Sequence, residues 1–200
     1  MSVDTPLFNL RAMEGRDIPS VVSVDRQVFR DPWPESAYVQ EIYFNPNAHY
    51  FVLELLDLTQ VRRWYEPRRR QASRLIGFVG MRVEGFRGHI STLALRAEWR
   101  GHRLGEFLLL VAINQAISDG AHVLGLEVRV SNAVAQRLYA KYDFERQSQL
   151  RGYYSDGEDA YYLQVRVEDN PDYCARVKQR YEALASDLQV KCSARETQGA

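Results

Sequence analysis

The segment Leu104–Ile117 (LGEFLLLVAINQAI) is apolar on nearly every side of a helix. A helix of this kind is buried between other elements, because it has no face suited to water. Gly120 follows the segment and marks the end of the helix. The strongly apolar part, Phe107–Ile113, is too short to cross a bilayer. The segment therefore predicts a helix sandwiched in the core of a domain.

Strand-like and helix-like segments alternate through the rest of the chain. Further helices are predicted from Asp17 to near Phe29, at Glu35–Phe44, at Asn132–Tyr142 and from Asn170-Pro171 to Leu188. Strands are predicted at Leu7–Arg11, Tyr50–Leu58, Leu75–Val83, His89–Leu95, Val123–Val130, Glu145–Leu150 and Ala160–Val167, with a turn at Gly85–Gly88. This order predicts an α/β fold with a sheet of mixed direction.

Composition sets wide limits on function. The chain has 200 residues, of which 26 are basic and 26 acidic. It therefore has no net charge that would attract it to nucleic acid or membranes. Its four His and two Cys form no close ligand set, so no metal site is predicted. Cys174 and Cys192 are interpreted as ordinary thiols of a reduced compartment. Because the N-terminal residues lack a signal-peptide pattern, a soluble and cytoplasmic protein is expected.

We expect one domain over residues 1–168, an amphipathic helix at 169–190 and a flexible tail at 191–200. Within the domain, Thr59–Arg74 is a basic insertion that carries six arginines against the single acid Glu66. Two interpretations of this insertion stay open. It is either a solvated loop between two strands or a weak contact for an acidic partner such as RNA.

The loop Trp99–Gly105 precedes the buried helix and is rich in Arg and Gly. Amides at a helix start lack partners and lie at the positive end of the dipole, so the loop suits a phosphate-bearing ligand. Arg100 and Arg103 add positive charge, while Gly101 and Gly105 allow close backbone approach. The alternative interpretation is a basic, capped turn.

The strand at Leu126–Arg129 and the helix after it carry two further candidates. Glu127 shares a strand face with Arg129 and is either half of a structural ion pair or a general base. Tyr139 is either a core aromatic or a proton donor, since a phenol with a pKa of about 10 can protonate a departing thiolate. Asn132 is either a helix cap or a contact for a ligand. Together with the loop, these residues suit acyl transfer from a nucleotide thioester.

These segments resemble the GCN5-related N-acetyltransferase (GNAT) superfamily over roughly residues 7–167. Trp99–Gly105 stands where that superfamily has its R/Q-x-x-G-x-G/A loop. Within it, the chain is most similar to bacterial ribosomal-protein alanine N-acetyltransferases of the RimI type. The positions that carry the resemblance are Asp31-Pro32-Trp33, Leu93-Ala94-Leu95, LEVRVSN at Leu126–Asn132, Leu138-Tyr139, Arg151-Gly152-Tyr153-Tyr154 and Glu158-Asp159-Ala160. It implies a mixed central sheet of about six to seven strands flanked by helices, with an extra C-terminal helix.

The resemblance also implies acetyl-CoA as cofactor and a role for each matching position. Glu127 would accept a proton and Tyr139 would donate one. The other positions comprise three strand residues for the pantetheine arm, the pyrophosphate loop, one further cofactor contact and four residues of an acceptor slot. They are Leu93, Ala94 and Leu95; Arg100, Gly101, His102, Arg103, Leu104 and Gly105; Asn132; and Trp33, Arg151, Tyr153 and Tyr154.

Two positions depart from the family pattern. Arg103 replaces the first glycine of the loop motif; its amide can still donate if the backbone there is helical, and its guanidinium can reach toward a phosphate. Asp143 replaces the glycine usual before Phe144, and aspartate tolerates a left-handed turn less readily than glycine. The basic insertion is also longer than expected for this branch.

The expected reaction is direct attack of an amine on acetyl-CoA in a ternary complex, because no Cys in the motif region offers a covalent route. The resemblance points to the N-terminal alanine of a small-subunit ribosomal protein as acceptor. Other protein N-termini, a lysine side chain and a small amine stay open. So do a non-catalytic acyl-CoA-binding module and an RNA-associated partner.

Overall fold

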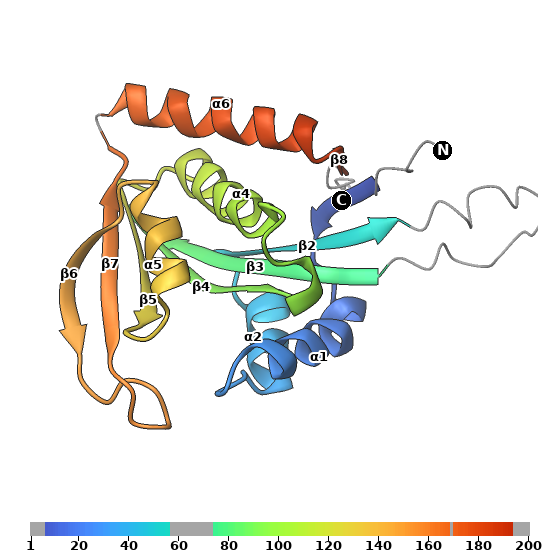
Figure 1. The fold of residues 1–200 in the computed structure, drawn as a ribbon, viewed down its shortest axis with the longest axis horizontal. Coiled ribbons are helices and arrows are strands. Elements are labelled where there is room, and N and C mark those ends of the chain that lie inside the picture. The colour runs from blue at the N-terminus through green and yellow to red at the C-terminus, as the bar shows by residue number, and fades with distance from the viewer. Residues whose placement is uncertain (1–6, 57–73, 169, 194–200) are drawn as a thin grey trace, which may run out of the picture.

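A computed structural model describes residues 7–56, 74–168 and 170–193, which form one sheet covered by helices on both faces (Figure 1). The sheet has eight strands in the order β6-β7-β5-β4-β3-β2-β1-β8. In chain order they are β1 Leu7–Ala12, β2 Ala48–Leu56, β3 Arg74–Glu84, β4 Arg87–Leu95, β5 Val123–Arg129, β6 Glu145–Leu150, β7 Ala160–Arg166 and β8 Val190–Cys192. β4–β5 and β1–β8 pair in parallel and the other neighbours are antiparallel.

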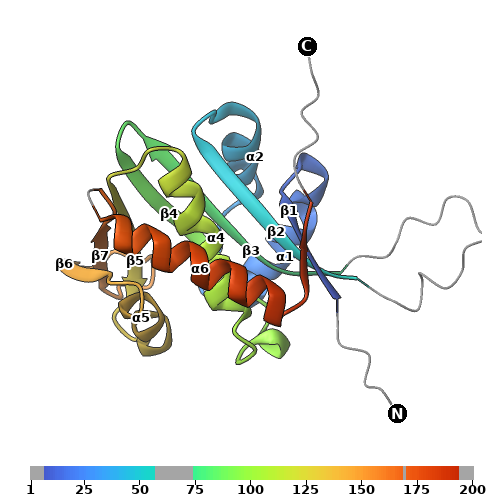
Figure 2. The same cartoon turned by 90° about the horizontal axis from the view of Figure 1, so that it is seen from above.

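Five α-helices lie within the described residues. They are α1 Ile18–Val28, α2 Glu35–Phe44, α4 Leu104–Ser118, α5 Ala133–Ala140 and α6 Pro171–Asp187, and short 3₁₀ turns occur at Gly15–Asp17 and Ala97–Trp99. Helices α1 and α2 cover one face of the sheet, and α4 covers the other (Figure 1). Helix α6 crosses outside α4, as the view from above shows (Figure 2). None of these helices has the length and apolar character that a bilayer crossing requires.

Helix α4 is sandwiched between the sheet and α6, as its composition predicts. Its residues from Phe107 to Ile113 are all buried, and the ring of Phe107 stacks on Tyr181 of α6 with 5.4 Å between centroids. A separate apolar cluster joins α1 and α2 to the opposite face of the sheet around the fully buried Tyr38. Each face of the central strands is therefore covered by apolar side chains.

Strands β4 and β5 pair only through Arg87–His89 and Val123–Gly125. On its other side β4 pairs with β3, with a register shift that leaves Ser91 unmatched between Ile90 and Thr92. Beyond Gly125, β5 is paired with β7 along its length. The two strands thus separate at the middle of the sheet while each stays anchored to another neighbour.

The predicted α/β class is confirmed, and the helix and strand positions agree within a few residues. The β3–β4 turn is tighter than expected, because Glu84 pairs with Arg87 and leaves only Gly85 and Phe86 in the turn. Residues 59–73 of the basic insertion lie outside the described residues, and Arg74 begins β3.

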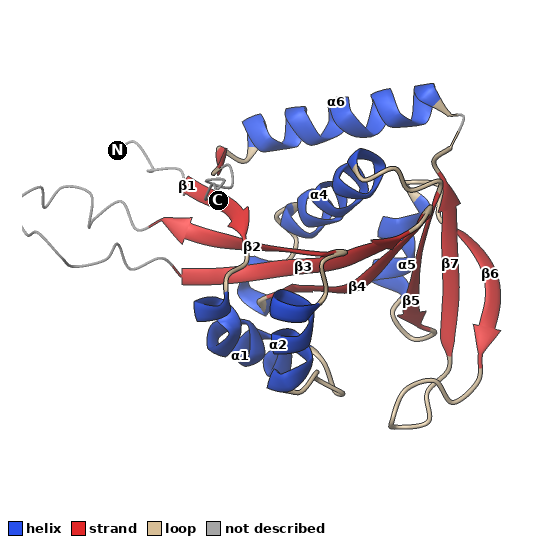
Figure 3. Ribbon diagram, turned by 180° about the vertical axis from the view of Figure 1, so that it is seen from behind, coloured by secondary structure: helices blue, strands red, loops and turns tan. Residues whose placement is uncertain are grey.

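Strand β8 was not among the expected elements. It includes the first two residues of the tail that was expected at 191–200. Val190 and Lys191 pair with Phe8 and Asn9 of β1, and the amide of Ser193 donates to the carbonyl of Leu10 at 2.9 Å. Lys191 and Cys192 are exposed, so no apolar pattern marks this strand in the sequence. It forms because the backbone of β1 offers partners at the edge of the sheet. Figure 3 shows the opposite edge, formed by β6.

Arg11 of β1 holds together two buried carboxylates. It pairs with Asp17 and with Glu54 of β2, each at 2.6 Å, and its side chain is only 17% exposed. Burial raises the pKa of Asp17, but the hydrogen bonds from Arg11 and from the amide of Glu14, together with the charges of Arg11 and Arg16, outweigh this, so the pKa lies below its ordinary value. The network ties the start of α1 to the sheet.

We expect Arg11→Met to lower the free energy of unfolding by about 3 kcal/mol, because it removes the cation that two buried carboxylates share. Urea-induced unfolding measures this. Arg16→Met is the matched control: its partner Glu14 is 53% exposed and Arg16 itself 58%, so its loss should cost less than about 1 kcal/mol. Equal effects of the two variants would contradict the assigned role of Arg11.

Candidate active site

A cavity of about 220 Å³ lies where β4 and β5 separate. Its walls come from β4, β5, α5 and the segments after α1 and β6. The residues lining it are Asp25, Phe29, Asp31, Trp33, Ile90, Ser91, Thr92, Leu93, Leu126, Glu127, Val128, Arg129, Asn132, Ala135, Leu138, Tyr139 and Tyr154. The structure therefore brings Glu127, Tyr139, Leu93, Asn132, Trp33 and Tyr154 to one cavity.

Glu127 contacts a histidine rather than the arginine on its own strand. One of its carboxylate oxygens lies 2.8 Å from Nε2 of His89, whose other ring nitrogen lies 3.4 Å from Oγ of Ser91. His89 pairs with Gly125 in the last β4–β5 step, so Glu127, two residues further along β5, points to the same face. The contact orients the carboxylate.

Arg129 is held by other groups. Its guanidinium pairs with Asp156 at 2.9 Å and Glu158 at 2.8 Å, and it lies 3.8 Å from the ring centre of Tyr154. The structural Glu127–Arg129 pair that the sequence left open is therefore not formed. Instead, Arg129 ties the loop after β6 to the end of β5.

Tyr139 is 9% exposed and lines the same cavity as Glu127. Burial, with a smaller contribution from nearby Tyr154, raises the pKa of Tyr139 to about 12. The phenol is therefore protonated throughout the neutral range. A group in that state can donate a proton but cannot act as a base.

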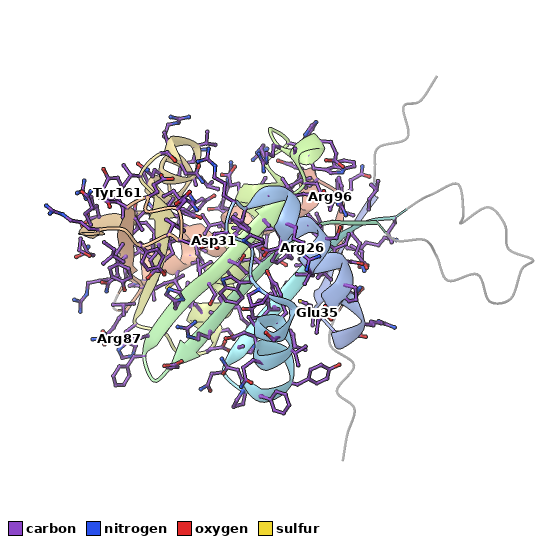
Figure 4. All side chains as sticks on the ribbon, turned by 90° about the horizontal axis from the view of Figure 1, so that it is seen from below. Arg26, Asp31, Glu35, Arg87, Arg96 and Tyr161 are labelled. Carbon is purple, nitrogen blue, oxygen red and sulfur yellow. The ribbon has the colours of Figure 1, made fainter. Side chains whose placement is uncertain are left out.

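Two loops that border the cavity carry the acceptor-slot candidates Trp33 and Tyr154. The segment after α1 is fixed by buried Asp25, which accepts a hydrogen bond from the amide of Trp33 at 2.7 Å. Burial raises the pKa of Asp25 above its ordinary value. Asp31 accepts from the amide of Ser155 at 3.3 Å and so joins this segment to the β6–β7 loop. Figure 4 shows Asp31 between the helix carrying Arg26 and the strand carrying Tyr161.

The remaining acceptor-slot candidates, Tyr153 and Arg151, are not among the residues that line the cavity. Tyr153 is 50% exposed, and its ring meets that of Tyr154 edge to face at 5.1 Å. Burial raises the pKa of Tyr153, and the charge of nearby Glu127 adds to the shift. Arg151 is exposed and does not line the cavity.

A larger groove of about 840 Å³ continues from the cavity toward the start of α4. The two spaces share Phe29, Leu93, Arg129, Asn132, Ala135 and Leu138 as lining residues. The groove is also lined by Leu95, Arg100, Gly101, Arg103 and Gly105, five of the residues predicted to contact the cofactor. Six cationic residues line it, namely Arg30, Arg100, Arg103, Arg129, Arg137 and Lys141. An extended anion such as a nucleotide fits this distribution of charge.

Asn132 caps α5, since its side chain accepts from the amide of Ala135 at 3.1 Å, and it also faces both spaces. Both interpretations of this residue are compatible with its position. Ala94 and Leu104 are buried in the core, so only their backbones are available to a ligand. His102 is exposed, and its ring lies 2.9 Å from the carbonyl of Arg100.

Arg103 adopts a left-handed backbone conformation, with φ 63° and ψ 3°, as the N-cap of α4. The helical backbone considered for it is therefore wrong: the position keeps the conformation typical of glycine although it carries a long side chain. The guanidinium reaches Asp187 of α6 at 3.3 Å and Glu106 at 3.8 Å. Asp143 is also left-handed, with φ 58°, as its position before Phe144 predicts.

His89 and Asp25 are the site residues that the sequence did not single out. His89 sits at the start of a predicted strand, and only the β4–β5 register brings it to Glu127. Asp25 lies on the apolar side of an amphipathic helix, where an acid is unusual, and this was the available signal.

No cluster of three or more His, Cys, Asp or Glu side chains in the described ranges could hold a metal ion.

A family model described as the acetyltransferase (GNAT) family matches residues 18–144. The chain therefore belongs to the GNAT family, and it is an acetyl-CoA-dependent N-acetyltransferase.

Individual relatives agree with this class. A Bacillus subtilis protein, named provisionally as a ribosomal protein bS18-alanine N-acetyltransferase, is 32% identical over 161 residues, which are 80% of this chain and 96% of the relative. The N-alpha-acetyltransferase RimI of Mycobacterium tuberculosis is 27% identical over 80% of this chain and 94% of its own length. The crystal structure of the Escherichia coli ribosomal-protein-S18-alanine N-acetyltransferase shares the fold, with a TM-score of 0.66 at 23% identity over 80% of this chain and 94% of that one.

The left-handed backbone of Arg103 leads us to predict a difference in stability between two variants. Arg103→Ala and Arg103→Gly both remove the guanidinium, so the difference between them isolates the backbone. We expect the glycine variant to be more stable by about 1 kcal/mol, because a Cβ is disfavoured at positive φ. Denaturant unfolding of both variants measures the difference. An alanine variant as stable as the glycine variant would contradict the left-handed assignment.

Proposed function

We propose that this enzyme acetylates the α-amine of a protein N-terminus, with the N-terminal alanine of a small-subunit ribosomal protein as the preferred acceptor. The observation that carries the proposal is the shared cavity of Glu127 and Tyr139, which opens into the cationic groove. It supplies a proton acceptor, a proton donor and an anion site in continuous space. The names of the Bacillus and Escherichia relatives support the choice of acceptor.

The residues of the groove fit acetyl-CoA. Its cationic side chains would face the phosphates, and the amides at the start of α4 would receive the pyrophosphate. Gly101 has φ 81°, and a Cβ at this position would meet no atom within 4 Å, so the space beside this loop is open. The separated edge of β4 near Leu93 would pair with the amides of the pantetheine arm. The bound cofactor supplies the activated acetyl group.

Each step assigned to this chain is a proton transfer or an act of positioning. Glu127, oriented by His89, accepts a proton from the attacking amine, directly or through water. A backbone amide of β4 in the stretch Leu93–Leu95 donates to the developing oxyanion. Tyr139 donates its proton to the leaving sulfur. Trp33, Tyr153 and Tyr154 border the path of the acceptor peptide.

Glu127→Gln and Tyr139→Phe should each lower kcat about 100-fold or more, because each removes one proton-transfer group. Isothermal titration should show CoA affinity within about twofold of wild type, since neither change alters the cationic groove. Initial rates of CoA release give kcat. Arg166→Ala, at an exposed position of β7 outside both spaces, is the control and should retain activity. Full turnover in both variants would refute the assigned roles.

The acceptor can be identified from the pH dependence of kcat/KM and from the rates with different acceptor peptides and amines. An α-amine acceptor should give kcat/KM that rises to a plateau near pH 8, whereas a lysine acceptor should continue to rise toward pH 10.4. Because the pKa of Tyr139 is about 12, loss of its proton does not interfere over this range. CoA release is measured with peptides that begin with Ala or another residue, an acetyl-blocked lysine peptide and a polyamine. Preference for the lysine peptide or the polyamine would refute the proposed acceptor.

A further inference from the structure

Glu106 is the only acidic residue among the described residues that line the cationic groove. It lies in the first turn of α4, whose amino terminus is the proposed pyrophosphate site. Its side chain is only 8% exposed. A carboxylate in the first turn stabilises a helix because it faces the positive end of the dipole. For the same reason it competes with any phosphate that approaches that end.

Two of the partners of the Glu106 carboxylate lie outside the groove. Tyr142 donates to its Oε1 at 2.8 Å, and Nη2 of Arg180 on α6 donates to the same oxygen at 3.2 Å. Arg103 approaches the other oxygen at 3.8 Å. Burial raises the pKa of Glu106, but the hydrogen bonds from Tyr142 and Arg180, together with the charges of Arg180 and Lys141, outweigh it, so the pKa lies below its ordinary value. The group is therefore charged at neutral pH.

Arg180 does not line the groove, and α6 lies beyond the residues 18–144 that match the family model. Helix α6 packs along α4 (Figure 2). From α6, Arg180 reaches Glu106 in the first turn of α4 at 3.2 Å. Within the described contacts of Glu106, Arg180 is the ion-pair partner that comes from outside the acetyltransferase core. Arg103, in contrast, belongs to the loop itself and divides its guanidinium between Glu106 and Asp187.

We propose that the C-terminal helix α6 is part of the acetyl-CoA site, because its Arg180 neutralises Glu106 and so keeps the start of α4 attractive to the pyrophosphate. Arg180 is thus a positioning residue, which acts on the cofactor only through Glu106. This inference rests on the proposed binding of acetyl-CoA in the groove. It explains how a carboxylate can occupy the first turn of a phosphate-binding helix without excluding the ligand.

The test is a double-mutant cycle read out by CoA binding in isothermal titration at fixed ionic strength. Arg180→Ala should raise the Kd for CoA about fivefold, a modest effect because Arg180 is 42% exposed and solvent screens its charge. Glu106→Gln should bind CoA as tightly as wild type or tighter. The double variant Arg180→Ala with Glu106→Gln should recover affinity to within about twofold of Glu106→Gln alone. The recovery separates electrostatic relief from a structural role of Arg180.

Arg176→Ala is the matched control on the same helix. Arg176 pairs with Asp143 and does not line the groove, so its loss should leave the Kd unchanged. Arg180→Gln provides a second neutral variant if alanine impairs folding, which urea unfolding would reveal. Unchanged affinity in a folded neutral variant, or no recovery in the double variant, would overturn the inference. Absence of CoA binding by wild type would instead overturn the proposed cofactor site.

Discussion

The separation of β4 from β5 is the constraint on which the site depends. The two strands pair through three residues each and then diverge, while β4 remains paired with β3 and β5 with β7. A gap inside a sheet leaves backbone groups without ladder partners, which is costly unless another molecule satisfies them. The proposed pantetheine arm, itself amide-bearing, is suited to this edge. The same gap admits Glu127 from β5 and Tyr139 from α5 to one cavity.

Basic and acidic side chains around this gap are arranged differently. Basic side chains from the α1 end, the loop before α4, β5 and α5 line one continuous groove. Three acids near the gap have particular partners: Glu127 contacts His89, Glu158 pairs with Arg129, and Glu106 contacts Tyr142 and Arg180. The groove therefore presents net positive charge, although the whole chain is neutral. Local geometry, and not overall composition, creates the field that a nucleotide would meet.

Much of the fold and part of the site could be predicted from sequence because they follow from local patterns. The all-round apolarity of α4, the Asn170-Pro171 start of α6 and the alternating strands each report a short-range preference. Positions near a motif, such as Gly101 or Leu93, were found through the family resemblance. His89 was missed because its role depends on the register between two strands that are separated by a helix. Strand β8 was missed because backbone pairing with β1, rather than side-chain pattern, produces it.

Arg103 and Glu127 show which features the sequence determines and which depend on the tertiary structure. Sequence alone determined that the loop before α4 carries an arginine where the motif it resembles has glycine, and that a carboxylate follows two residues after Gly125. Only the tertiary structure decided that Arg103 stays left-handed and turns toward α6, and that Glu127 meets His89 instead of Arg129. The reason is physical: hydrophobic periodicity is encoded within a segment, whereas the partner of a charged side chain is set by which distant segments pack against it.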